Sequence, residues 1–238
     1  PEIVFAAIGL ISSSAFLPVL LLKDCSIPVR AYKSWRIQFK DAMKTGFQAT
    51  ELWLAGLLEF VVNIGLYSAK AFLPLYALQQ NIPVVWVGLF FTIQELIHLA
   101  ARPFGGRLSD LTGHLPVTAA GMMLAALSLG LMPIATSTQP LLLLAIGIGL
   151  AQALIFPSIV ALYAQKIDSR HTGAGTGIIG SFKNAGKIAG PIIGGLIIHW
   201  HDFSWMLWSM AGLLATWGLV LLLNPFSRKT FLIQWQSR

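Results

Sequence analysis

Seven long runs of apolar residues, separated by short polar connections, divide the chain. A helix that crosses the hydrocarbon core of a bilayer needs roughly 20 mostly apolar residues, and each run is long enough to supply them. The pattern therefore predicts an all-α integral membrane fold with seven transmembrane helices embedded in a lipid bilayer. The expected spans are residues 1–22, 52–80, 84–106, 115–137, 140–164, 172–199 and 203–224.

The composition agrees with this prediction, because 56% of the residues are hydrophobic and only 11% are charged. A soluble domain usually carries about a quarter charged residues. The single cysteine, Cys25, belongs to no metal-ligand pattern. No nucleophile–base pair and no phosphate-binding loop is recognisable. We therefore expect neither an enzyme nor a bound metal or cofactor.

The net charge of +7 would suggest nucleic acid in a soluble protein, but here the basic residues alternate between connections. The connections near 81–83, 138–139 and 200–202 contain no lysine or arginine. Basic residues mark the cytoplasmic side of membrane proteins, so we expect a multi-pass protein of the cell membrane, with its start outside, its tail in the cytoplasm and no nucleic-acid partner. The basic residues are Lys23, Arg30, Lys33, Arg36, Lys40 and Lys44, then Arg102 and Arg107, then Lys166 and Arg170, and finally Arg228, Lys229 and Arg238.

The segment 23–50 is the only long hydrophilic stretch, and it follows the first expected span. Its apolar residues lie roughly along one side if it is helical. It is either an amphipathic helix on the inner leaflet or a plain basic linker.

Six ionisable residues fall at membrane depth within the expected spans, where each costs about 2.5–3.5 kcal/mol at the centre of an isolated helix. Such residues are tolerated when they face a protein interior or a water-filled path. We therefore expect the spans that contain them to border a wet passage. They are Glu59 and Lys70 in the second span, Glu95 and His98 in the third, and Lys183 and Lys187 in the sixth.

Helical spacing places these residues in stripes. One side of a helix carries Glu59, Asn63, Tyr67 and Lys70, and one side of the next carries Glu95, His98 and Arg102. Lys183 and Lys187 are four residues apart and repel each other unless an anionic group is near.

The roles of the individual residues stay open. Lys183 or Lys187 either pairs with Glu95 to fix helix packing or faces a substrate path. Lys70 either snorkels toward the outer boundary or takes part in a site, and His98 is either a packed histidine or a functional one. The glycines of the sixth span favour close helix contact in lipid, because Gly186, Gly190 and Gly194 recur every four residues.

The connection RPFGGRLSDLTGH, residues 102–114, resembles the cytoplasmic loop motif of the major facilitator superfamily, in which glycines allow a tight turn. Gly106, Asp110 and Gly113 match the motif, whereas Leu111 and His114 stand where the family prefers basic residues. Arg102 and Arg107 complete the basic loop. The stretch AFLPLYALQQN, residues 71–81, is similar to the outer end of the family's seventh helix, and the passage from residue 156 through GPIIGG at 190–195 is similar to its tenth and eleventh helices.

This resemblance implies a particular organisation of the chain. The chain resembles helices six to twelve of a twelve-helix transporter, so we expect the first five helices of the N-terminal half to be missing. The second, third, fifth and sixth spans would then line the central cavity, and the fourth and seventh would lie outside. The implied domains are 1–22, the last helix of the N-terminal half; 23–50, the inter-half loop; 51–224, the C-terminal six-helix bundle; and 225–238, the cytoplasmic tail.

The resulting functional hypothesis is a secondary transporter that works by alternating access together with the N-terminal half. A carboxyl group in a low-dielectric cavity can exchange protons near neutral pH, so Glu95, His98 and Glu59 are the expected proton-coupling residues. The GPIIGG stretch resembles the drug–proton antiporter branch and favours efflux of a small molecule. Paired lysines favour uptake of an organic anion or phosphorylated metabolite, and a non-transporting membrane scaffold is the third alternative. The expected substrate-binding residues are Lys183, Lys187, Asn63, Tyr67, Asn184 and Gln152.

Overall fold

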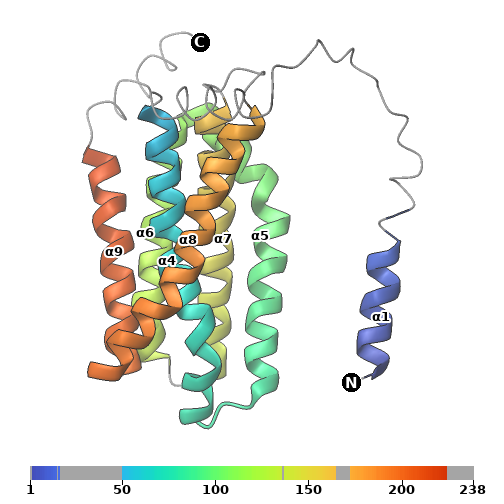
Figure 1. Cartoon of the computed structure of the whole chain (residues 1–238). Helices are drawn as coiled ribbons and strands as arrows, with labels where there is room; N and C mark the ends of the chain where they lie inside the picture. Colours follow the sequence, from blue (N-terminus) through green and yellow to red (C-terminus); the bar gives the residue numbers. More distant parts are fainter. Residues whose placement is uncertain (1, 15, 17–49, 136, 165–171, 224–238) are drawn as a thin grey trace. The chain divides into compact units, whose positions relative to one another are not determined.

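The structure, a computed structural model, describes residues 2–14, 16, 50–135, 137–164 and 172–223 (Figure 1). The chain divides into two units, residues 1–39 and 40–238, and each is considered separately. In the first unit, α1 (Glu2–Ser13) covers part of the first expected span. Most of the rest of that span, almost all of the basic segment 23–50, the connection 165–171 and the expected tail lie outside the described residues.

The second unit is a bundle of long helices that run side by side (Figure 1). Each long helix corresponds to one expected span, and the described residues contain no strand. The bounds are α4 (Thr50–Gln79), α5 (Val84–Thr112), α6 (His114–Leu131), the 3-10 helix η1 (Met132–Ile134), α7 (Thr138–Ala164), α8 (Thr172–Trp200) and α9 (Phe203–Leu223).

Five of the described helical stretches are long and apolar enough to cross a membrane: Leu52–Gln79, Val84–Thr112, His114–Ile134, Thr138–Ala164 and Phe203–Leu223. The helix α8 has 29 residues but is not one of the five, because its glycines and its two lysines lower its hydropathy. The prediction of an all-α integral membrane fold is confirmed.

The turn between α5 and α6 consists of Gly113 alone. Gly113 has φ 100°, a backbone conformation that is open to glycine and costly for residues with a Cβ atom. Its N–H donates to the carbonyl of Ser109 at 2.9 Å. The helix α5 therefore continues through the loop motif, past the expected end at residue 106, and stops only where this glycine turns the chain.

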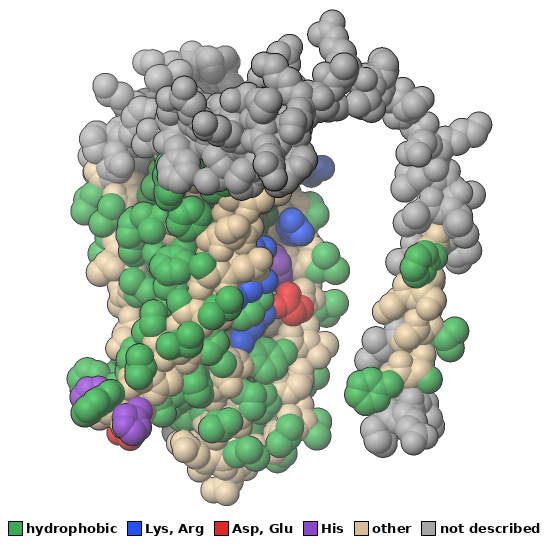
Figure 2. All heavy atoms as spheres, in the orientation of Figure 1, with side chains coloured by type: hydrophobic (Ala, Val, Ile, Leu, Met, Phe, Trp, Pro, Cys, Tyr) green, Lys and Arg blue, Asp and Glu red, His purple; other side chains and the backbone are tan. Residues whose placement is uncertain are grey.

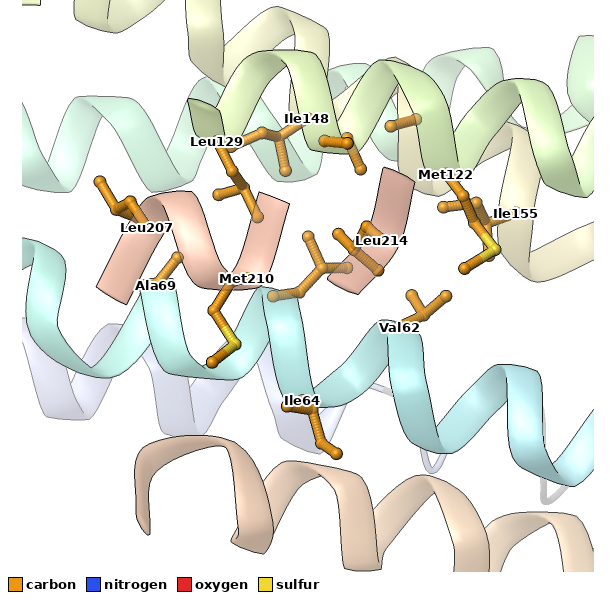
Figure 3. Packing of buried hydrophobic residues seen from close by; sticks show 14 of the residues in the cluster. Val62, Ile64, Ala69, Met122, Leu129, Ile148, Ile155, Leu207, Met210 and Leu214 are labelled. Atoms are coloured by element: carbon orange, nitrogen blue, oxygen red, sulfur yellow. The ribbon is translucent and has the colours of Figure 1, made fainter. Parts of the chain in front are cut away.

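The core of the bundle is apolar and is built mainly by α4, α6, α7 and α9 (Figure 3). Closely packed pairs surround it: α4 lies along α8, α5 along α7, and α6 along both α7 and α9. Among the core residues are Val62, Ile64 and Ala69 of α4, Met122 and Leu129 of α6, Ile148 and Ile155 of α7, and Leu207, Met210 and Leu214 of α9.

The contact between α4 and α8 depends on small residues, as the glycine spacing predicts. A Cβ atom on Gly186 would lie 2.5 Å from the carbonyl oxygen of Phe60, and one on Gly190 would lie 2.7 Å from that of Ile64. The hydroxyl of Ser68 donates to the carbonyl of Gly190 at 2.6 Å. The prediction of close helix contact is confirmed, and this contact holds the lysine-bearing helix against α4.

Candidate functional site

Ionisable side chains gather on one face of the bundle, between α8 and α5 (Figure 2). In this view lysine, glutamate and histidine side chains lie together near the middle of the helices, and a separate group of histidine and acidic side chains lies at the lower left end of the bundle.

Glu95 of α5 is held by two partners. The ammonium of Lys70, on α4, donates to Oε1 of Glu95 at 2.7 Å. The Nδ1 atom of His98, one turn along α5, lies 3.3 Å from Oε2. The carboxylate therefore has a contact on each oxygen, although 54% of the Glu95 side chain is still exposed. Glu95 is therefore an accessible carboxylate that lies between a lysine and a histidine.

His98 is less exposed than Glu95 and is only partly satisfied. If Nδ1 carries the proton and donates to Glu95, Nε2 is left as an acceptor. Nε2 is buried and has no hydrogen-bond partner among the described residues. The ring lies against Phe156 of α7, with 5.7 Å between ring centroids. Nε2 of His98 is therefore a buried polar atom that no described residue satisfies.

Aromatic rings connect these residues to the lysine pair of α8. The ammonium of Lys187 lies 5.0 Å from the ring centroid of Tyr67, and that of Lys70 lies 5.5 Å from the same ring. The ammonium of Lys183 lies 5.2 Å from the ring centroid of Phe156. These distances are in the range of cation–π contacts.

These contacts form a closed circuit across α4, α5, α7 and α8, which we call the charged ring. It starts at Lys187, passes through Lys70, Glu95 and His98, and returns to Lys183, one helical turn from Lys187. The four helices that carry it are those that the family resemblance assigns to a central cavity. Its members are Tyr67, Lys70, Glu95, His98, Phe156, Lys183 and Lys187.

Glu59 belongs to the same stripe of α4 but is almost fully buried, with 3% of its surface exposed. The amide nitrogen of Asn63 donates to its Oε2 at 2.9 Å and to its backbone carbonyl at 2.7 Å. A buried carboxylate is costly unless it is paired or hydrogen-bonded, and the amide of Asn63 supplies a hydrogen bond to this one.

The remaining expected substrate residues have different surroundings. Gln152 of α7 is buried and accepts a hydrogen bond from Gln94 of α5 at 3.0 Å, so it joins these two helices. Asn184 lies exposed on α8. Their roles in substrate binding stay predictions.

The loop motif lies at the end of α5. Arg102 and Arg107 are exposed there, and Asp110 is exposed near the Gly113 turn. The hydroxyl of Ser109 lies 2.7 Å from Nδ1 of His114, the residue that stands where the family prefers a basic one. The motif is thus built around a tight connection between two helices.

The family model described as Major Facilitator Superfamily matches residues 55–236, which is most of the chain. The chain belongs to the major facilitator superfamily. Its relatives in this superfamily include the MFS-type transporter YuxJ of Bacillus subtilis, which is 28% identical over 192 residues, 79% of this chain and 48% of YuxJ. The multidrug resistance protein MdtG of Serratia proteamaculans is 29% identical over 72% of this chain and 43% of MdtG.

A third relative is the quinolone resistance protein NorA of Staphylococcus aureus, 25% identical over 58% of this chain and 36% of NorA. The chain thus matches about half or less of the length of these superfamily members. Since the superfamily consists of membrane transporters, this chain is a multi-pass membrane protein of a transporter family.

The sequence points to most members of the charged ring but leaves two connections undetected. From the sequence, Lys70 either snorkels or takes part in a site, and Lys183 or Lys187 either pairs with Glu95 or faces a substrate path. In the structure it is Lys70 that pairs with Glu95. Phe156 is not among the expected residues, although it lies between His98 and Lys183. The polar stripe that ends at Lys70 is a sequence signal for the contact between Lys70 and Glu95. A single phenylalanine in an apolar span gives no signal for the contacts of Phe156.

Proposed function

We propose that this protein acts in a proton-coupled transporter that moves a small organic molecule across the cell membrane by alternating access. Residues 51–224 form one six-helix half, and the charged ring faces the passage shared with a second half. The span 1–22 belongs to that second half, 23–50 is the basic loop between the halves, and 225–238 is the cytoplasmic tail. The start of the chain is outside the cell.

The observation that carries this proposal is the position of Glu95 between Lys70 and His98. While Glu95 is ionised, it holds Lys70 across the α4–α5 boundary. Protonation of Glu95 removes the ion pair and releases Lys70, and His98 supplies a neighbouring proton acceptor. Such a switch biases two arrangements of the helices by local electrostatics, which is what coupling to a proton requires.

Export is the proposed direction, and the drug-resistance names of MdtG and NorA support it. Uptake of an organic anion is the second candidate, favoured by Lys183 and Lys187 on the same face as Glu95. A scaffold without transport is less well supported, because ionisable groups within membrane spans are costly and a scaffold has no use for them.

The test is transport by Glu95→Gln. The full transporter is reconstituted in inverted vesicles, and uptake of the fluorescent quinolone norfloxacin is followed with and without an imposed proton gradient. We expect the wild type to respond to the gradient and Glu95→Gln to lose that response. Asp202→Asn, which removes a carboxylate from the connection between α8 and α9, serves as the control and keeps the response. Gradient-driven uptake that persists in Glu95→Gln would falsify the proton-coupling role.

A further inference from the structure

We propose that the charged ring is a binding site for an amphiphilic organic anion, a molecule with one carboxylate, sulfonate or phosphate group on an aromatic body. This inference rests on the proposed function and deepens it, since it names the substrate class of the same face. It is supported by the distribution of charge around the ring and by the two aromatic side chains within it.

The charged ring has an excess of positive charge. Three lysines and one carboxylate leave two positive charges when His98 is neutral, and the buried carboxylate of Glu59 balances one of these at most. Lys183 and Lys187 form no ion pair with any described residue, and their ammonium groups lie over aromatic rings instead. Cations four residues apart on a helix repel each other, so an anion between them lowers the electrostatic energy.

The carboxylates near the lysine pair are already engaged. Both oxygens of Glu95 have partners, Lys70 and His98. Glu59 is buried and is held by Asn63. Among the described residues of the ring, no free carboxylate is therefore available to a cationic ligand, whereas two ammonium groups are available to an anionic one.

The charged ring also favours a ligand with an aromatic group. Tyr67 and Phe156 are half-buried and stand next to the lysines on two sides of the circuit. An aromatic ligand that places its anionic group between Lys183 and Lys187 can pack against these rings. A lipid headgroup is a poorer candidate, because both lysines lie near the middle of α8 rather than at its ends.

The test compares two probes with the same aromatic body and opposite charge, naphthalene-2-sulfonate and (2-naphthylmethyl)trimethylammonium. Their binding to the purified protein in a non-ionic detergent is measured by calorimetry. We expect the sulfonate to bind and the ammonium compound to bind at least about tenfold more weakly, as loss of charge-assisted contacts implies. Equal affinity for the two probes overturns the proposal.

Variants then locate the site. Lys183→Gln with Lys187→Gln should weaken sulfonate binding about tenfold or more, whereas Lys183→Arg with Lys187→Arg keeps the charge and most of the affinity. Arg107→Gln, which removes a positive charge at the end of α5, is the matched control and should bind normally. A chromatographic profile like that of the wild type establishes that each variant is folded.

Two outcomes contradict the site. One is unchanged sulfonate binding in the folded double glutamine variant, which would place the sulfonate elsewhere. The other is displacement of the sulfonate by micellar phosphatidylglycerol, which would assign the lysines to a lipid headgroup.

The binding measurement is independent of proton coupling, because it is made at equilibrium without a gradient. Sulfonate binding that survives in a protein without gradient-driven transport contradicts the proposed function and leaves this site standing. Gradient-driven transport in a protein that does not prefer the sulfonate contradicts this site alone.

Discussion

Asn63 and Glu59 are two polar residues that the helix α4 buries together. Asn63 is fully buried and Glu59 is 3% exposed, yet both belong to the same stripe as Tyr67 and Lys70 of the charged ring. The amide of Asn63 donates to the Glu59 carboxylate. A buried acceptor that loses its donor bears the full desolvation cost, so the side chain of Asn63 stabilises the protein through Glu59.

Asn63→Ala should therefore destabilise the protein by about 1–2 kcal/mol, the lower part of the cost of an unsatisfied buried polar group. The lower part applies because the substitution also removes Oδ1 of Asn63, which has no partner among the described residues. Thermal unfolding in detergent, followed by tryptophan fluorescence, measures the effect.

The matched control is Asn184→Ala, the same substitution at an exposed position of α8, which should leave the unfolding temperature nearly unchanged. Glu59→Gln added to Asn63→Ala should recover part of the loss, because it removes the buried charge. Equal unfolding temperatures for the two alanine variants would contradict this account.

The helix α8 differs from its neighbours because it combines lysines with closely spaced glycines. The glycines face α4, where Gly190 approaches the backbone of Ile64, and the two lysines reach the rings of Tyr67 and Phe156. Close packing of the glycines thus fixes the height and rotation of the lysines. This arrangement explains how a helix with low hydropathy is held within the bundle.

Gly190→Leu should separate α4 from α8, because even its Cβ atom would meet the carbonyl of Ile64 at 2.7 Å. Overpacking of this kind costs about 1–3 kcal/mol or more. The readout is the fraction of protein that remains monodisperse after heating. Gly180→Leu is the matched control, since nothing lies within 4 Å of a Cβ atom at that position. If both variants withstand heating equally, the glycine contact does not hold these helices together.

We propose that the basic connections set the orientation of the bundle, that is, which of its ends faces the cytoplasm. The turn between α5 and α6 would face the cytoplasm, and the connection between α8 and α9 would face outward. The charged ring would then lie between the two surfaces, at the depth where alternating access places a substrate site.

Labelling of single cysteines tests this orientation. In a Cys25→Ser background, Asp202→Cys should react with a membrane-impermeant maleimide in intact spheroplasts. Leu111→Cys, at the exposed end of α5, should react only after the membrane is permeabilised. The reverse pattern of labelling would show that the bundle is inserted with the opposite orientation.

The apolar runs are sufficient to predict the helices from α4 to α9 within about two turns, because a bilayer imposes a minimum length and an apolar surface on every span. The loop motif likewise predicts a tight turn near Gly113, and the glycine spacing predicts a close contact between α8 and a neighbouring helix, which the structure shows to be α4. The extension of α5 to Thr112 is not predicted, since Gly105 and Gly106 resemble a break in a helix. Gly105 instead lies against the backbone of Ala153 of α7, and this packing keeps the helix continuous.

Residue types and helical spacing, read without coordinates, establish the membrane class, the helices, and the stripes that carry Glu95, Lys183 and Lys187. They cannot establish which stripes meet, because spacing reports the side of one helix and says nothing about its neighbour. Only the packing of α4 against both α5 and α8 places Lys70 on Glu95 and the Tyr67 ring beside Lys187. Contacts between different helices depend on their rotation and height in the bundle, and these are set by the sum of many close contacts across the core.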